Sequence, residues 1–129
     1  MQGRILLVDA SGELERTLRE IIDDRPFPLT KVQSMAEGMQ HLLEGQVDIL
    51  VCGKTDRFGS WSQWIALAKE QNPRTLCIVV AQGDDAQKAL EHDQVFGVVD
   101  GPHDVEACRE LLNIAIAFSI LPRERAPRS

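Results

Sequence analysis

Apolar residues occur along this chain in two patterns, as short continuous runs and as longer stretches with helical spacing. The continuous runs are four to six residues long and end at polar residues or glycine. Strands of a parallel sheet covered on both faces show this pattern, because neither face meets water. We therefore expect buried strands at 4–8, 49–52, 76–81 and 95–99, and an alternating edge strand at 29–33.

Stretches with helical spacing follow these runs. Ser11 is expected to cap the first helix, and residues 34–37 form a capping box that starts the second. A short helix is expected up to about residue 91, and Pro102 is expected to start the last helix, where proline costs no hydrogen bond. The apolar faces of the first three helices are Leu14, Leu18, Ile21 and Ile22; Met35, Met39, Leu42 and Leu43; and Trp61, Trp64, Ile65 and Ala68.

Five strands thus alternate with five helices. This order predicts an α/β fold, a doubly wound five-stranded parallel sheet with right-handed crossovers. The chain has 129 residues, a length that suits one domain with a single core. We assign that domain to residues 1–121 and expect 122–129, which are polar and carry prolines, to form a tail or linker.

Charge and composition exclude several classes of partner. The chain has 14 Lys and Arg against 20 Asp and Glu, a net charge of −6, and only four Phe, two Trp and no Tyr. An acidic domain with few aromatics is not expected to bind nucleic acid directly. No apolar run approaches the roughly 18 residues of a membrane span, and no secretory signal precedes the first strand.

The three cysteines indicate the cellular location that we expect for this protein. Cys52, Cys77 and Cys108 lie in apolar stretches without the spacing of a metal or redox motif. We interpret them as buried thiols of a protein kept in a reducing environment, and we expect the protein to be cytoplasmic.

Sites in open parallel sheets form just beyond the carboxyl ends of the strands. The ends that matter here are Asp9-Ala10 after the first strand, Gly53 after the third, Val80 in the fourth and Gly101-Pro102 after the fifth. The central position, Gly53, has no side chain to supply chemistry.

These strand ends and their spacing resemble the receiver domains of two-component response regulators, over about residues 4–118. Residues 5–9, Ile-Leu-Leu-Val-Asp, are close to that family's opening strand, and Gly101-Pro102 stands where the family has Lys-Pro. The resemblance implies a flavodoxin-like (βα)5 fold with strand order 2-1-3-4-5. It also implies a phosphoacceptor aspartate after the third strand, an acidic pair that holds Mg²⁺, and a hydroxyl and a lysine that stabilise the phosphoryl group.

This sequence departs from the family at most of those positions. The resemblance therefore implies a degenerate receiver, or pseudo-receiver, that cannot take phosphate in the usual way, and no Mg²⁺ or other cofactor is expected. Asp9 and Pro102 match the family, whereas the second acid falls on Ala10, the phosphoacceptor on Gly53, the hydroxyl on Val80 and the lysine on Gly101.

Two alternatives would restore some chemistry at this end of the sheet. Asp56, three residues after Gly53, is a candidate for a displaced phosphoacceptor in a working receiver. A divalent cation held by Asp9, Asp56 and Asp100 is a second candidate, although one fixed carboxylate and two uncertain ones make a poor site. Asp9 can equally cap the first helix or accept hydrogen bonds from local amides.

The same architecture hosts nucleotide- and flavin-binding proteins, so a small-ligand sensor or an enzyme is a further alternative. The first strand-to-helix turn carries one glycine instead of G-x-G-x-x-G, and no P-loop motif is present. His41, His92 and His103 have no partner at the spacing of a metal site or catalytic triad. We expect no enzymatic activity.

Protein association is the stronger positive expectation. Val105, Cys108, Leu112 and Ala115 form the sheet-facing stripe of the last helix, while Leu111, Ile114, Phe118 and Leu121 form an adjacent apolar set. That set indicates a homodimer contact, the docking of a following segment, or a helix fully covered within the monomer. Receivers associate through the fourth and fifth helices and the fifth strand, so the resemblance points to the same surface and to a fused output domain in a longer bacterial regulator.

Overall fold

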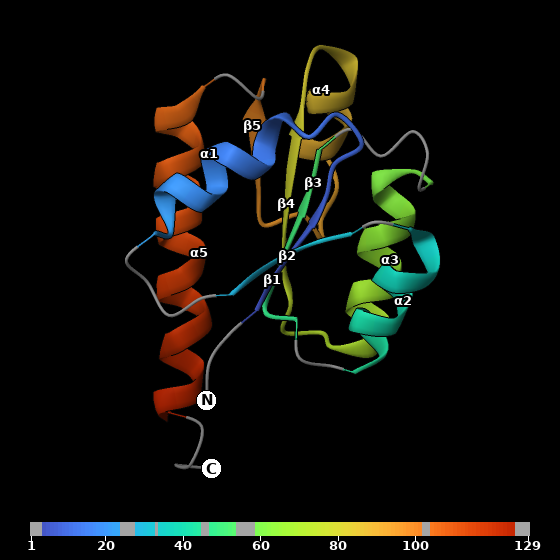
Figure 1. The fold of residues 1–129 in the computed structure, drawn as a ribbon, viewed down its shortest axis with the longest axis vertical. Coiled ribbons are helices and arrows are strands. Elements are labelled where there is room, and N and C mark those ends of the chain that lie inside the picture. Colours follow the sequence, from blue (N-terminus) through green and yellow to red (C-terminus); the bar gives the residue numbers. More distant parts are fainter. Residues whose placement is uncertain are drawn as a thin grey trace.

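The computed structural model describes residues 4–23, 28–32, 34–44, 47–53, 59–101 and 104–125, with side chains up to residue 119. Strands and helices alternate along the chain (Figure 1). The strands are β1 (Ile5–Val8), β2 (Leu29–Lys31), β3 (Ile49–Cys52), β4 (Leu76–Ala81) and β5 (Gly97–Asp100). The helices are α1 (Glu13–Ile21), α2 (Met35–Leu43), α3 (Trp61–Gln71), α4 (Asp84–Leu90) and α5 (Val105–Arg125).

The strands form one parallel sheet in the order β2-β1-β3-β4-β5. The predicted fold class and strand order are therefore confirmed. Strands β1 and β3 are buried along their whole length, as expected for continuous apolar runs in the centre of such a sheet. The edge strand β2 is only half-buried.

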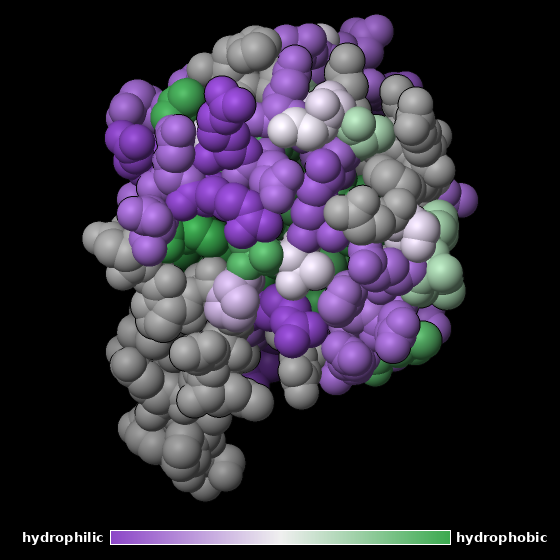
Figure 2. Space-filling model, in the orientation of Figure 1, coloured by the Kyte–Doolittle hydropathy of each residue, from purple (hydrophilic) through white to green (hydrophobic). Residues whose placement is uncertain are grey.

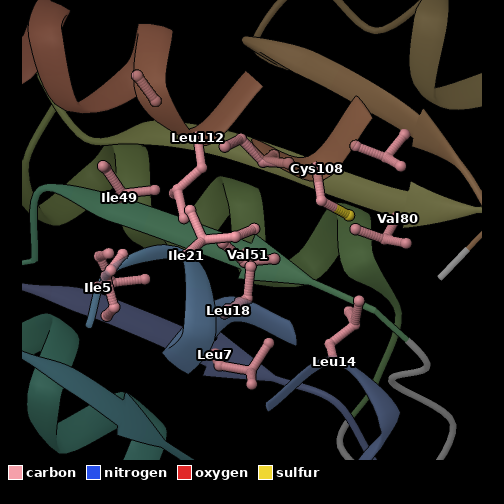
Figure 3. Packing of buried hydrophobic residues seen from close by; sticks show 14 of the residues in the cluster. Ile5, Leu7, Leu14, Leu18, Ile21, Ile49, Val51, Val80, Cys108 and Leu112 are labelled. Atoms are coloured by element: carbon pink, nitrogen blue, oxygen red, sulfur yellow. The ribbon is translucent and has the colours of Figure 1, made fainter. Parts of the chain in front are cut away.

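Helices cover both faces of the sheet (Figure 1). Helices α1 and α5 lie against one face, and α2, α3 and α4 lie against the other. Successive strand residues point to opposite faces, so each strand contributes to two separate cores. Figure 3 shows the first core, which includes Ile5, Leu7, Leu18, Val51 and Leu112. The second core includes Leu6, Val8, Leu50, Trp64, Ile65 and Val79.

Two helices start at residues other than those predicted. Ser11 is not the N-cap residue of α1, although its hydroxyl accepts a hydrogen bond from the amide of Glu13 at 3.2 Å. The N-cap is Gly12, with φ 78°, in the left-handed region that glycine tolerates. Helix α5 begins at Val105 instead of Pro102, and the Asp104 side chain accepts a hydrogen bond from the amide of Ala107 at 3.0 Å. Pro102 itself lies outside the described residues.

The predicted apolar face of α2 is partly wrong. Met39 and Leu43 are 38% and 63% exposed, whereas Leu42 and Gly38 are buried. The ring of Trp64 packs against Gly38, where an added Cβ would lie 2.7 Å from Cζ3 of Trp64. Because the ring of Trp64 packs against Gly38, the buried face of α2 includes Gly38 and Leu42 and leaves out Met39 and Leu43. Ser34 caps α2 as predicted, through the amide of Glu37.

The remaining differences concern element ends. Strand β5 covers Gly97–Asp100 instead of 95–99, and β2 is shorter than predicted. Helix α5 continues to Arg125, and the assignment of residues 1–121 to one domain stays a prediction. Residues 126–129 lie outside the described part. Val105, expected to face the sheet, is 38% exposed.

The cysteines are buried and free, as predicted. Burial raises the pKa of the Cys52 thiol well above its ordinary value, and the neighbouring Cys77 adds to this effect. Burial likewise raises the pKa of Cys77 to about 11, and the pKa of Cys108 is raised by burial and by Asp104. All three are therefore protonated and poorly reactive at neutral pH.

Candidate functional site

The strand register brings three of the predicted site residues together at the carboxyl end of the sheet. Val8 pairs with Cys52, and Cys52 pairs with Val79 on the next strand. The residues that follow, Asp9, Gly53 and Val80, are therefore side by side on neighbouring strands. The amide of Gly53 donates to the carbonyl of Val8 at 2.8 Å, which extends the β1–β3 ladder by one residue.

The carboxylate of Asp9 is used for local hydrogen bonds. Its Oδ1 accepts from the amide of Ser11 at 3.2 Å and from the Ser11 hydroxyl at 2.8 Å. Its Oδ2 accepts from the amide of Leu14 at 3.0 Å, inside the first turn of α1. Asp9 is only 1% exposed. The interpretation of Asp9 as an acceptor for nearby amides is confirmed, whereas the N-cap of α1 is Gly12.

The space beside Gly53 is occupied. A Cβ at Gly53 would lie 2.6 Å from Cδ1 of Leu14 and 3.0 Å from Oδ1 of Asp9. Figure 3 shows Leu14 next to the point where β3 ends. Sequence reasoning placed Leu14 in the apolar face of the first helix, but nothing in its spacing showed that it also covers the end of β3.

The positions after β4 and β5 are structural as well. Val80 is 5% exposed and packs in the core on the α1/α5 side. Gly101 is buried and has φ 99°, a backbone conformation that side-chain-bearing residues rarely adopt. Its amide donates to the carbonyl of Ala81 at 2.8 Å. Ala10 is exposed, and Pro102 lies outside the described residues.

The carboxylates proposed for a cation are not all close together. Asp9 follows β1 and Asp100 ends β5, and β3 and β4 lie between these strands. Three strand spacings separate such positions by about 14 Å, too far for both to bind one ion. Asp56 lies outside the described residues. Within the described ranges, no three His, Cys, Asp or Glu side chains are grouped as metal ligands would be.

Two surface hollows that are lined by described residues lie elsewhere on the molecule. One, of about 650 Å³, is lined by charged side chains of α1, among them Glu15, Arg16 and Arg19. The other, of about 490 Å³, is lined by residues that include Lys69, Leu76 and Phe96. Neither is lined by Asp9, Gly53, Val80 or Gly101, so neither hollow supports a ligand site at the strand ends.

The apolar set on α5 divides into covered and exposed members. Ile114 and Phe118 are 48% and 51% exposed. Leu111 is half-buried and packs where Gly97 leaves room on β5. Phe118 also contacts Phe96 edge to face, with ring centroids 5.6 Å apart. The side chain of Leu121 lies outside the described part.

The described surface on the face seen in the orientation of Figure 1 is mainly polar. Figure 2 shows hydrophilic residues over most of the described area on this face, with hydrophobic residues in small separate areas. Among the helices described here, none combines the length and apolar character needed to cross a membrane.

No protein-family model matches the chain, and no curated protein matches it significantly. Solved structures do match. The signal receiver domain of an HD domain-containing protein from Pseudomonas fluorescens is 21% identical, with a TM-score of 0.75 over 95% of this chain and 93% of that one. The receiver domain of NtrC4 from Aquifex aeolicus is 20% identical, with a TM-score of 0.73 over 90% and 98%.

A third match is part of a longer protein. NtrX from Brucella abortus is 13% identical, with a TM-score of 0.78, and the match covers all of this chain but only 30% of NtrX. At these identities the likeness defines the fold. The chain therefore has the flavodoxin-like receiver fold seen in response regulator receiver domains.

Proposed function

We propose that this chain is a pseudo-receiver, a signalling module that acts through protein contacts and does not use aspartate phosphorylation. The observation that carries the proposal is the end of β3. Gly53 stands in register beside Asp9, at the place where a receiver has its phosphoacceptor, and Leu14 and Asp9 leave no room there for a side chain.

The neighbouring strand ends support the same function. A receiver stabilises the phosphoryl group with a hydroxyl and a lysine, and here these positions carry Val80 and Gly101. Val80 is packed in the core, and the φ of 99° at Gly101 disfavours a lysine. Asp9, which would contribute to the metal site, instead accepts bonds from Ser11 and Leu14. Loss of nucleophile, hydroxyl and lysine together removes the reactive atom and the groups that stabilise its product.

The partners in this proposal are proteins. Ile114 and Phe118 provide exposed apolar area on α5, and association through this surface fits a module whose signal is a contact. The partial match to NtrX supports a role as one domain of a longer regulator that carries an output domain. Three buried free thiols are consistent with a reducing, cytoplasmic environment. No catalytic activity and no Mg²⁺ requirement are proposed.

Exposure to a phosphodonor tests the proposal directly. We expect no mass increase after incubation with acetyl phosphate and Mg²⁺, and no change in the amide NMR spectrum on adding beryllofluoride and Mg²⁺. A working receiver treated in parallel is the positive control.

Phosphorylation mapped to Asp56 would overturn the proposal in favour of a receiver with a displaced acceptor. The Asp56→Asn variant makes that outcome unambiguous, because it would abolish any mass increase that depends on this carboxylate.

A further inference from the structure

The carboxyl end of β3 is closed by a packing contact between two elements. Leu14 on α1 is 1% exposed, and its Cδ1 occupies the space that a Cβ at Gly53 would need. Contacts this close force a neighbour to move, and cores tolerate added atoms poorly. A residue larger than glycine at position 53 is therefore sterically incompatible with Leu14 in its present position.

Hydrogen bonds hold Leu14 in this position. The amide of Leu14 donates to Asp9, and the other oxygen of the same carboxylate accepts from the amide and hydroxyl of Ser11. The Gly53 amide in turn donates to Val8, the residue before Asp9. These hydrogen bonds, together with the packing of Leu14, connect the β1–α1 turn to the end of β3.

We propose that Asp9, Leu14 and Gly53 form a lock that keeps this end of the sheet in one closed arrangement. The lock fills the space that a reactive side chain at the end of β3 would need, while Gly53 itself is half-buried. This inference rests on the proposed function, because a module that signals without phosphotransfer does not need a phosphate-binding site at this end of the sheet. Signals would then have to arise at another surface.

A double-mutant cycle tests the lock. Gly53→Ala should raise the equilibrium constant for unfolding about tenfold when Leu14 is present, because the new methyl group has no space. In the Leu14→Ala background the same change should cost only about threefold, because the contact with Leu14 is gone and only Asp9, 3.0 Å away, still crowds the methyl group. Urea unfolding of the four proteins gives these factors, and Leu14→Val replaces Leu14→Ala should the latter fail to fold.

Leu18 provides the matched control. It is a leucine one turn further along α1, 3% exposed, and belongs to the same core. Gly53→Ala should keep its full tenfold cost in the Leu18→Ala background. Equal costs of Gly53→Ala in the Leu14→Ala and Leu18→Ala backgrounds would overturn the lock.

Amide hydrogen exchange gives a second measurement. Leu14→Ala should accelerate exchange at the Gly53 amide at least tenfold more than Leu18→Ala does, because only the first opens this end of the sheet. Equal acceleration would count against the lock. Beryllofluoride uptake by the unmodified protein would instead refute the proposed function, and the cycle would still report on the packing contact.

Discussion

The carboxylate of Asp9 is almost fully removed from solvent, at 1% exposed. A buried carboxyl group needs hydrogen-bond partners, and the backbone amides of Ser11 and Leu14 supply two of them. The residue at the position that matches a metal ligand in receivers thus accepts local hydrogen bonds. Asp9 has the residue type found at this position in receivers, but the groups around it determine which interactions it makes.

The buried thiols should make the protein less stable at high pH. The pKa of Cys77 is raised to about 11 in the folded state, while an unfolded thiol titrates near 8.5. Above that lower value the unfolded chain loses a proton that the folded chain keeps, so the free energy of unfolding falls as pH rises. Between pH 8 and pH 10 we expect Cys77 to account for a loss of about 1 to 2 kcal/mol.

Urea unfolding at the two pH values measures this loss, and Cys77→Ala is the comparison. The chain has no tyrosine, so no phenol titrates in the same range. The variant should lose less stability than the unmodified protein between pH 8 and pH 10. The same loss in both proteins would show that Cys77 titrates normally in the folded state.

At the scale of elements, Gly38 sets how closely α2 approaches α3. A Cβ at this position would collide with the ring of Trp64 and lie 3.2 Å from Cγ1 of Val32. Alanine favours helix formation over glycine by about 1 kcal/mol, yet overpacking a core costs about 1 to 3 kcal/mol. Trp64 is fully buried and has no room to retreat. We therefore expect the overpacking cost to be at the upper end of its range, so that Gly38→Ala lowers the free energy of unfolding by about 1 to 2 kcal/mol, measured in urea.

Gln40→Ala on the same helix is the matched control, because Gln40 is exposed and its replacement should be nearly neutral. In a Trp64→Leu background the penalty of Gly38→Ala should shrink. A Gly38→Ala protein as stable as the unmodified one would mean that α2 and α3 are less closely packed than described.

The strands were predictable because burial on both faces leaves a clear trace in the sequence. The apolar runs around Ile5, Ile49 and Leu76 coincide with strands of the sheet. Helix faces and helix ends were harder. The prediction that Met39 and Leu43 are buried was wrong because Trp64, distant in sequence, packs against Gly38. The predicted start of α5 was wrong because Asp104 supplies the cap.

The candidate site was predictable only as far as register allowed. Parallel pairing requires Asp9, Gly53 and Val80 to be neighbours once their strands are known, and the structure places them so. The partners of Asp9 were left open between local amides and a metal; its hydrogen bonds with Ser11 and Leu14 are now described, and the expected absence of a metal stays a prediction. The direction of the Leu14 side chain depends on a rotamer, which spacing along the chain does not specify.

For the whole molecule, association through α5 is the expectation that is most accessible to experiment. Ile114 and Phe118 expose about half of their surfaces on this helix. We expect a dimer whose population rises with protein concentration, and we expect Ile114→Glu to raise its Kd at least tenfold because a charge would be buried in the contact. Light scattering over a range of concentrations measures this change.

Ile114 is a sharper probe than Phe118, because Phe118 also contacts Phe96 within the same chain. Arg109→Glu places the same side chain at an exposed position about 140° round α5 from Ile114 and should leave Kd almost unchanged. A protein that stays monomeric at high concentration would contradict this expectation, and so would equal effects of Ile114→Glu and Arg109→Glu.

Helix α5 has 21 residues and is about 32 Å long, whereas the four residues of β1 span about 13 Å. Its last turns continue beyond the edge of the sheet (Figure 1). A rod of this kind transmits angle as well as distance, since each residue turns an α-helix by about 100°. Anything continuous with its far end would be held at a defined rotation about the axis. One residue inserted there would swing it to a different side, while seven would return it almost to its original bearing.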